Sequence, residues 1–273
     1  MFGLKKNNNK AKIFAFANQK GGVGKTTTAI NLGCAIAGAG EKVLIIDLDP
    51  QGNASTGLGI NKDDRKFSTY DILTSEQTIV DIKYKTLVQN LDIVPSTLDL
   101  LGLEAVLAED NEKSYKLKLA VEEFEVQSKN EYDYILIDCP PSLSLLTIMA
   151  LVASHALLVP LQTEFFALEG LTQLMKTIER IKNNLNPELT IRGILLTMYD
   201  RRNKLSGEVE KEARNYFKEK VYQSVVPRNV RLSEAPSHGV PVLIYDKACP
   251  GSKSYFSFTE EFLNQDKPVE SAA

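Results

Sequence analysis

The sequence lacks the features that mark secreted, zinc-stabilised or membrane-spanning proteins. It has no tryptophan, two histidines and three cysteines among its 273 residues. The cysteines are widely spaced and form no Cys-x-x-Cys pair, so neither a disulfide framework nor a zinc knuckle is expected, and a reducing cytoplasm fits best. No run of about 18 apolar residues occurs, so no segment is expected to span a membrane.

Net charge is also nearly absent. The formal value is -3, so no basic field over the whole chain would recruit nucleic acid, and any such site must be a local patch. The hydrophobic content of 43% and charged content of 25% are ordinary for a soluble globular protein. We expect a flexible lead-in over residues 1–11, one domain over residues 12–264 and a disordered tail over residues 265–273.

Short apolar runs alternate with longer amphipathic segments along the chain. The expected strands lie at residues 13–17, 43–46, 91–94, 135–137, 156–159, 191–196 and 221–226. The expected helices lie at residues 26–39, 98–108, 114–129, 144–153, 168–185 and 206–220. Continuous apolarity in the strands indicates that both faces of a parallel sheet are covered. The alternation predicts an α/β fold with a doubly wound, mostly parallel sheet and helices on both faces.

A glycine-rich loop follows the first expected strand and precedes a helix. It consists of Lys20, Gly21, Gly22, Val23, Gly24, Lys25, Thr26 and Thr27. This is the phosphate-binding P-loop pattern, except that Gln19 stands at the first glycine position and Lys20 is an additional lysine. The loop amides and the helix N-terminus would bind phosphate. Lys25 would neutralise the β- and γ-phosphates, and the Thr26 hydroxyl would bind Mg²⁺.

Acidic residues end two further strands. Asp47 and Asp49 follow one apolar run, and Asp138 follows another. Ligands of open α/β sheets lie beyond the carboxyl ends of the strands, so these carboxylates are expected beside the P-loop. An apolar run ending in Asp is the Walker B pattern, whose carboxylate holds Mg²⁺, usually through water.

These motifs together resemble those of the ParA/Soj chromosome- and plasmid-partitioning ATPases, in the deviant Walker A group that also contains MinD. The resemblance rests on residues 20–27, 47–52, 138–142, 160–170 and 227–239, and it covers residues 12–245. It implies an Mg²⁺-dependent ATPase that binds ATP and ADP and forms a homodimer in the ATP state. It further implies a ParB-like activator, nonspecific double-stranded DNA as a partner, and a cytoplasmic, nucleoid-associated location without membrane binding.

The resemblance also assigns roles to individual residues. Lys20 would reach the phosphates of the partner subunit's nucleotide, as an arginine finger does. Asp49 would position the attacking water, Asp47 would support the metal, and residues 140–142 would form a switch segment. Adenine recognition would fall to four positions near two strand ends. These are Met198, Pro227, Arg228 and Asn229.

The candidate DNA surface lies between residues 201 and 231. This segment carries nine Lys or Arg and four Glu, which gives +5 in a chain of net -3. Composition alone also fits a solvated helix face with Glu–Lys pairs. The resemblance favours DNA, and the matching positions are Arg202 and Arg231. Contacts of this kind would be made to phosphates and would weaken with salt.

Two other functions are alternatives to DNA partitioning. A MinD-like or other cargo-positioning ATPase bound to a membrane would need a basic amphipathic helix at the C-terminus, whereas residues 259–273 are acidic and interrupted by Pro268. An electron-transfer ATPase would need cysteines placed to hold an iron–sulfur cluster. Cys139 adjoins Asp138 and has no suitably placed second cysteine, so a packing role is expected for it, and His155 and His238 have no ligand partners at metal spacing.

Overall fold

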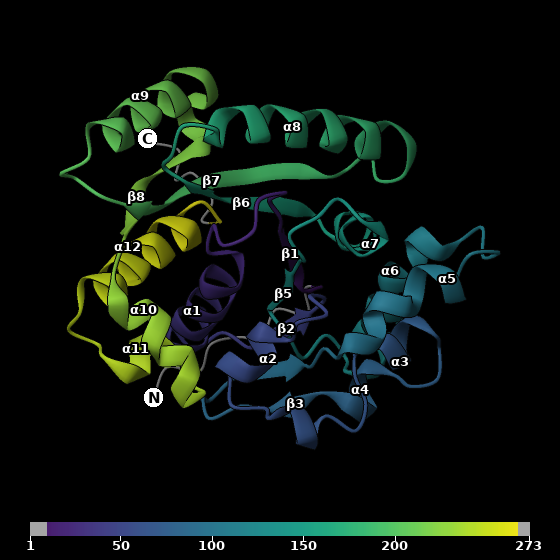
Figure 1. The fold of residues 1–273 in the computed structure, drawn as a ribbon. Coiled ribbons are helices and arrows are strands. Elements are labelled where there is room, and N and C mark those ends of the chain that lie inside the picture. Colours follow the sequence, from purple (N-terminus) through teal and green to yellow (C-terminus); the bar gives the residue numbers. More distant parts are fainter. Residues whose placement is uncertain (1–9, 267–273) are drawn as a thin grey trace, which may run out of the picture.

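An eight-stranded sheet forms the centre of the computed structural model, which describes residues 10–266 (Figure 1). The strand order is β3-β4-β2-β5-β1-β6-β7-β8, and every neighbouring pair is parallel except β3 and β4. The strands are β1 Lys12–Phe16, β2 Val43–Asp47, β3 Tyr84–Lys85, β4 Leu91–Val94, β5 Tyr134–Asp138, β6 Ala156–Gln162, β7 Thr190–Tyr199 and β8 Val221–Pro227. The predicted doubly wound fold is confirmed, and among residues 10–266 the short β3 is the only strand that had not been predicted.

Helices cover both faces of the sheet. They are α1 Lys25–Gly38, α2 Asn53–Gly57, α3 Thr69–Leu73, α4 Ile79–Ile82, α5 Leu103–Val106, α6 Lys116–Gln127, α7 Leu145–Ala153, α8 Ala167–Asn184, α9 Lys204–Phe217, α10 Val230–Glu234, α11 Val242–Tyr245 and α12 Pro250–Asn264. In Figure 1, α1 and α10 to α12 lie on one side, and α6 to α9 lie on the other. Each side has its own hydrophobic core, because alternate residues of a strand face opposite ways.

The central strands consist of continuous apolar runs because both of their faces are buried. Ile13 and Ala15 of β1 pack into the core beneath α6 to α8, whereas Phe14 and Phe16 pack into the core beneath α1 and α12. All five residues of β2 are buried. Burying a side chain of this size stabilises the fold by about 1.5–3 kcal/mol. Both layers are therefore needed to cover the sheet.

Two helical expectations need correction. The helix expected over residues 98–108 is divided into a 3₁₀ segment, Leu98–Gly102, and the four-residue α5. Its leucines alternate between the core and the surface: Leu100 and Leu103 are buried, while Leu98 and Leu101 are exposed. The helix expected over residues 206–220 begins at Lys204, where the Asn203 side chain accepts a hydrogen bond from the Leu205 amide.

The C-terminal helix α12 was not predicted. It packs against α1 and β8 through three buried aromatic residues, Tyr255, Phe258 and Phe262. The expected lead-in and tail lie almost entirely outside the described residues. Where the tail is described, Asp266 forms ion pairs with Lys12 and Arg192. These contacts lie at the amino end of β1, on the edge of the sheet opposite the P-loop.

Candidate functional site

The P-loop connects β1 to α1 and lines one pocket with Gly22, Gly24, Lys25, Thr26 and Thr27. Gly22 and Gly24 have φ angles of 73° and 89°, a left-handed conformation that strains residues bearing a Cβ. No side chain caps the start of α1, and its first turn contains no acidic residue. The first amides of the helix are therefore available to an anion. The Thr197 hydroxyl donates to the Val23 carbonyl over 2.8 Å, which fastens the loop to β7.

The two lysines of the loop have different surroundings. Lys25 is 6% exposed, and its Nζ donates to the Lys20 carbonyl over 3.1 Å. Burial lowers the pKa of Lys25, while the nearby Asp138 and Asp49 oppose that shift. The side chain of Lys20 is half-exposed and forms an ion pair with Glu164, in the turn before α8. Lys25 is thus directed inward, whereas Lys20 lies at the surface.

Asp47 and Asp138 end the adjacent strands β2 and β5 and lie opposite each other in the strand register. Both are fully buried. Asp47 accepts hydrogen bonds from the Ser55 amide at 2.9 Å, the Ser55 hydroxyl at 2.7 Å and the Asp49 amide at 3.1 Å. Burial raises its pKa to about 6, although the bonds from Ser55 oppose the shift.

Asp138 differs from Asp47 because it has no comparable partners. Within residues 10–266, neither carboxylate oxygen of Asp138 has a well-formed hydrogen bond. Burial raises its pKa well above the usual range, with a further increase from Asp47, and the neighbouring Thr26 hydroxyl opposes it. Two buried and unpaired oxygens are costly unless a ligand satisfies them. The Asp138 carboxylate and the Thr26 hydroxyl are oxygen donors of the kind that Mg²⁺ prefers.

The described residues supply only part of a metal coordination shell. Across residues 10–266, no group of three or more His, Cys, Asp and Glu side chains is arranged to hold a metal ion. Mg²⁺ keeps several waters and binds through one or two carboxylates together with substrate phosphates. The arrangement therefore fits a metal that arrives with a nucleotide and does not fit a closed structural site.

Asp49 lies in the wall of the pocket that would hold the phosphates. It lines the pocket of about 450 Å³ that also contains Lys25 and Thr26. Its Oδ1 accepts from the Gln51 amide at 3.0 Å, and its carbonyl accepts from the Ser96 hydroxyl at 2.6 Å. The Ser96 amide in turn donates to the Ser55 hydroxyl over 3.0 Å. The loop that carries Asp49 is therefore fixed from two sides, and its carboxylate has access to the pocket.

A second pocket, of about 570 Å³, adjoins the first. The residues expected to contact adenine, Met198, Pro227, Arg228 and Asn229, all line it, together with Gly24 and Thr27 of the P-loop. Met198 lines both pockets and has a φ of 51°, so β7 bends sharply near its end. A phosphate chain on the loop and a flat ring beyond Met198 would fill the two pockets together.

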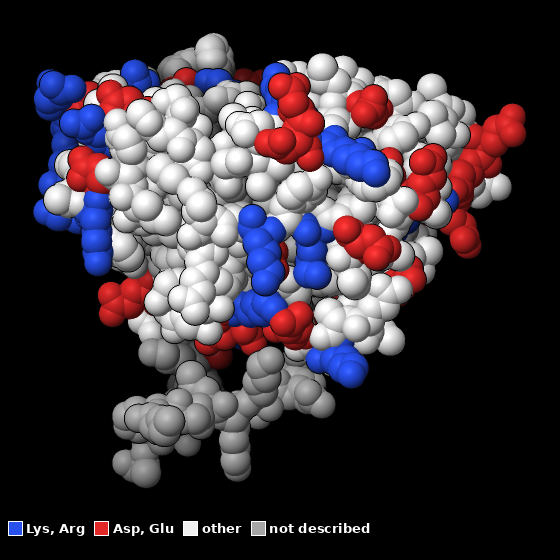
Figure 2. Space-filling model, turned by 90° about the horizontal axis from the view of Figure 1, so that it is seen from below, with Lys and Arg blue, Asp and Glu red and all other residues white. Residues whose placement is uncertain are grey.

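The two arginines predicted to bind DNA are exposed but already paired. Arg202 binds both carboxylate oxygens of Asp200, at 3.0 and 2.9 Å, and Arg231 contacts Glu234 at 2.7 Å. Asp246 lies 3.5 Å from Arg231. Figure 2 shows Lys and Arg gathering along the left margin, the side on which α9, α10 and α12 lie in Figure 1. A phosphate would have to compete with these carboxylates.

The remaining sequence-predicted residues take structural positions. Cys139 is buried among apolar side chains, and His155 accepts a hydrogen bond from the Ile13 amide at 3.0 Å. His238 stacks on Tyr245. The sequence analysis missed the supporting residues Ser55 and Ser96, because a single hydroxyl in a loop carries no periodic signal. No helix in the described part of the chain has the length and apolarity needed to cross a bilayer.

The chain is similar to characterised proteins over almost its whole length. Residues 11–191 match the family model described as an AAA domain. The chain is 53% identical to the chromosome partitioning protein ParA of Caulobacter vibrioides, with 97% of this chain and 98% of that protein aligned. It is 50% identical to the sporulation initiation inhibitor protein Soj of Bacillus subtilis, with 92% and 97% aligned.

The fold is also found among solved structures. Cobyrinic acid a,c-diamide synthase from Mycobacterium smegmatis, with a bound ATP analogue and magnesium, matches with a TM-score of 0.80 at 32% identity. The match covers 93% of this chain and 95% of that one. The likeness therefore extends over the whole sheet and both helical layers, and it is not confined to the P-loop.

Proposed function

The chain belongs to the ParA/Soj family of partitioning ATPases, and from that premise we propose that it is an Mg²⁺-dependent ATPase whose ATP-bound dimer holds nonspecific DNA. The observation that carries the nucleotide part is the Asp138 carboxylate, buried beside Thr26 without a well-formed hydrogen bond from any described residue. A metal accompanied by phosphates would satisfy both oxygens. The buried Lys25 and the uncapped start of α1 would bind the phosphates themselves.

The metal would be held by the Thr26 hydroxyl and, through water, by Asp138, with Asp47 in support. When bound, Mg²⁺ neutralises charge on the β- and γ-phosphates. Asp47 receives three hydrogen bonds and thereby sets the position of Ser55 and of the Asp49 backbone. Asp138 is the carboxylate left available to the metal's water shell.

Hydrolysis transfers the γ-phosphoryl group to water, breaks its bond to the β-phosphate oxygen and releases ADP and phosphate. Asp49 would orient the attacking water, since its carboxylate faces the pocket and its backbone is fixed by Ser96. Lys25 would stabilise the charge that develops on the phosphate oxygens. Positioning and electrostatics are the main contributions that a protein makes to this reaction.

A second subunit would complete the site. The family resemblance implies that Lys20 acts on the nucleotide of the partner subunit. Lys20 lies at the surface and its side chain is half-exposed, so it could break its ion pair with Glu164 and reach another chain. The ATP state and the dimer would therefore form together, and a ParB-like protein would stimulate hydrolysis and end that state.

DNA would bind to the dimer through the basic surplus of residues 201–231. Arg228 is exposed, and within the described residues it has no carboxylate within 4 Å, so unlike Arg202 and Arg231 it would not have to leave an ion pair to bind a phosphate. Two copies of a weak patch on one dimer gain avidity. The alternative of a MinD-like cargo-positioning ATPase shares this fold, and the relatives at 50% identity or more favour partitioning over it.

The decisive experiment is DNA co-sedimentation of the chain with ATP, ADP or no nucleotide across a range of salt concentrations. We expect pelleting with ATP alone and a loss of pelleting as salt rises. Equal pelleting in all three nucleotide conditions would contradict the proposal. Lys25→Ala, which lacks the phosphate-binding ammonium, is the matched control and should not pellet with ATP.

A further inference from the structure

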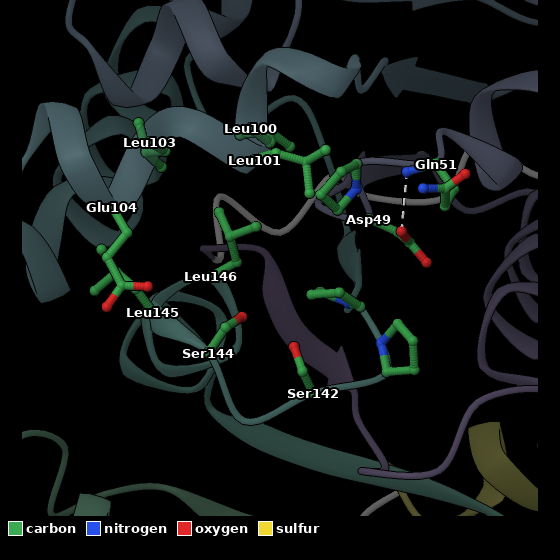
Figure 3. A pocket seen from close by; sticks show the side chains of 13 residues that line it. Asp49, Gln51, Leu100, Leu101, Leu103, Glu104, Ser142, Ser144, Leu145 and Leu146 are labelled. Atoms are coloured by element: carbon green, nitrogen blue, oxygen red, sulfur yellow. Dashed lines mark hydrogen bonds between the residues drawn. The ribbon is translucent and has the colours of Figure 1, made fainter.

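A groove that adjoins the nucleotide pocket opens on the other side of Asp49. It has a volume of about 310 Å³ and lies between residues 100–104 and residues 140–146 (Figure 3). Leu101 and Leu146 face it from opposite walls, Asp49 and Gln51 stand at one end, and Glu104 stands at the other. We call it the Leu101 groove.

The lining of the groove is mostly apolar, and its acidic lining residues are Asp49 and Glu104. Leu101, in the wall, is 69% exposed, and the neighbouring Leu98 and Val106, which lie outside the lining, are 58% and 59% exposed. The segment from residue 98 to 112 contains five Asp or Glu and no Lys or Arg. Within residues 10–266, Asp99 and Glu104 have no cation within 4 Å, whereas Asp110 pairs with Lys116.

The groove shares lining residues with the site of hydrolysis. Asp49, Gln51 and Pro141 line both the groove and the nucleotide pocket. Ser96, whose hydroxyl holds the Asp49 carbonyl, lies five residues before Leu101. A segment packed against Leu101 would therefore act on the backbone that fixes Asp49, without entering the nucleotide pocket.

We propose that the Leu101 groove is the docking site of the protein that activates hydrolysis, and that it receives a segment with leucine-like side chains flanked by Lys or Arg. The inference rests on the proposed function, which requires such an activator. Charge complementarity selects the occupant, since Glu104 in the groove and the other acidic residues of segment 98–112 beside it attract a basic segment and repel nucleic acid. A second copy fits less well: net -3 overall and +5 in residues 201–231 leave -8 on the rest of the chain.

Docking is measured directly with a fluorescent probe at Leu101. All three native cysteines are buried, so Leu101→Cys supplies an accessible thiol for an environment-sensitive dye. The labelled full-length chain is titrated, with ATP and Mg²⁺, against the ParB-like protein of the same genome. We expect a saturable signal whose apparent affinity falls about tenfold or more from 50 to 500 mM salt. A signal that saturates with ATP alone would assign the groove to a second copy and overturn the proposal.

Function is tested with Leu101→Ser and Glu104→Lys. Both should keep basal hydrolysis and ATP-dependent DNA binding, and both should lose about tenfold or more of the activator's stimulation. Leu87→Ser is the matched apolar control, because Leu87 is 79% exposed and precedes β4 at the opposite end of that strand. Glu122→Lys, an exposed position on α6, is the matched charge control.

The outcomes separate this proposal from the one on which it rests. Loss of stimulation in the two groove variants, with both controls unaffected, supports docking in the groove. If the unmodified chain is stimulated and Leu101→Ser is stimulated equally, the groove proposal alone is wrong. If the unmodified chain is not stimulated at all, the activator step of the proposed function fails, and the groove proposal fails with it.

Discussion

Lys20 forms an ion pair with Glu164 of its own chain, in the turn that precedes α8. This is the lysine that the family resemblance predicts to act in the partner subunit. In the dimer, Lys20 would exchange Glu164 of its own chain for a phosphate bound to the partner subunit. Dimer formation would therefore require the loss of one surface ion pair.

Glu164→Gln should make the ATP-dependent dimer form at lower ATP concentration. A partly exposed ion pair contributes about 1 kcal/mol at most, so the half-maximal ATP concentration should fall by about fivefold or less. Light scattering during an ATP titration measures the dimer, with Glu169→Gln on the exposed side of α8 as the control. An increase in the required ATP would mean that Glu164 serves the dimer directly.

The two P-loop lysines should separate binding from dimerisation. Lys25→Ala should abolish ATP binding, because the buried ammonium is the cation placed against the phosphates. Lys20→Ala should bind ATP and remain monomeric. Calorimetry and light scattering on both variants check this pair of outcomes. Unchanged ATP affinity in Lys25→Ala would refute the assignment of the loop.

Asp49→Ala should bind ATP, dimerise and hydrolyse at least about 100-fold more slowly, since it loses the group that orients water. Ser96→Ala should show a smaller loss of turnover, because it frees the Asp49 carbonyl but leaves the carboxylate. Phosphate release under single-turnover conditions measures both rates. Normal turnover in Asp49→Ala would remove Asp49 from the mechanism.

The strength of DNA binding should depend on the exposed arginines and on the carboxylates that pair with them. Arg231→Glu and Arg228→Glu should remove ATP-dependent DNA binding and leave DNA-independent hydrolysis intact. Asp200→Asn should strengthen binding, because it releases Arg202 from its two-bond contact. A gel shift at several salt concentrations tests all three variants, with Lys83→Glu, on the far side of the sheet from β8, as the charge control. Normal binding by Arg231→Glu would refute the patch.

Stability should fall as the pH drops below about 6.5 because of His155. His155 is an exposed residue, but partial desolvation of its ring lowers the pKa, although Glu125 and Glu188 oppose the shift, and Nδ1 accepts from the Ile13 amide. A histidine with a lowered folded-state pKa binds fewer protons in the folded state, so its contribution is present above the unfolded pKa and is lost in acid. One buried group of this kind changes the unfolding free energy by about 1.4 kcal/mol per pH unit. Because His155 is exposed, solvent screening should keep its contribution well below that figure.

Urea unfolding between pH 5 and 8 measures this dependence. His155→Gln keeps an acceptor and does not titrate, so its unfolding free energy should vary less with pH over this range. His238→Gln is the matched control, because His238 is also exposed and its ring stacks on Tyr245. An identical pH profile for His155→Gln and the unmodified chain would show that the imidazole carries none of the effect.

Periodicity predicted the central strands because both of their faces are buried, and it failed where burial follows no simple pattern. Residues 98–108 have helical spacing, yet Leu98 and Leu101 stay exposed and the segment breaks near Gly102. The opposite failure is α12, which is rich in serine and aromatic residues. Its buried Tyr255, Phe258 and Phe262 do recur at helical spacing, so this signal was present and was overlooked.

The sequence by itself determined the order of strands and helices, the phosphate loop and the carboxylates at the ends of β2 and β5, because these are properties of local residue patterns. Only the tertiary structure decided which of them meet. It leaves Asp138 without a well-formed hydrogen bond while Asp47 has three, pairs Lys20 with Glu164 across about 140 residues of chain, and joins Ser96 to Asp49. Such contacts depend on how separate segments pack, and no local pattern of residues encodes them.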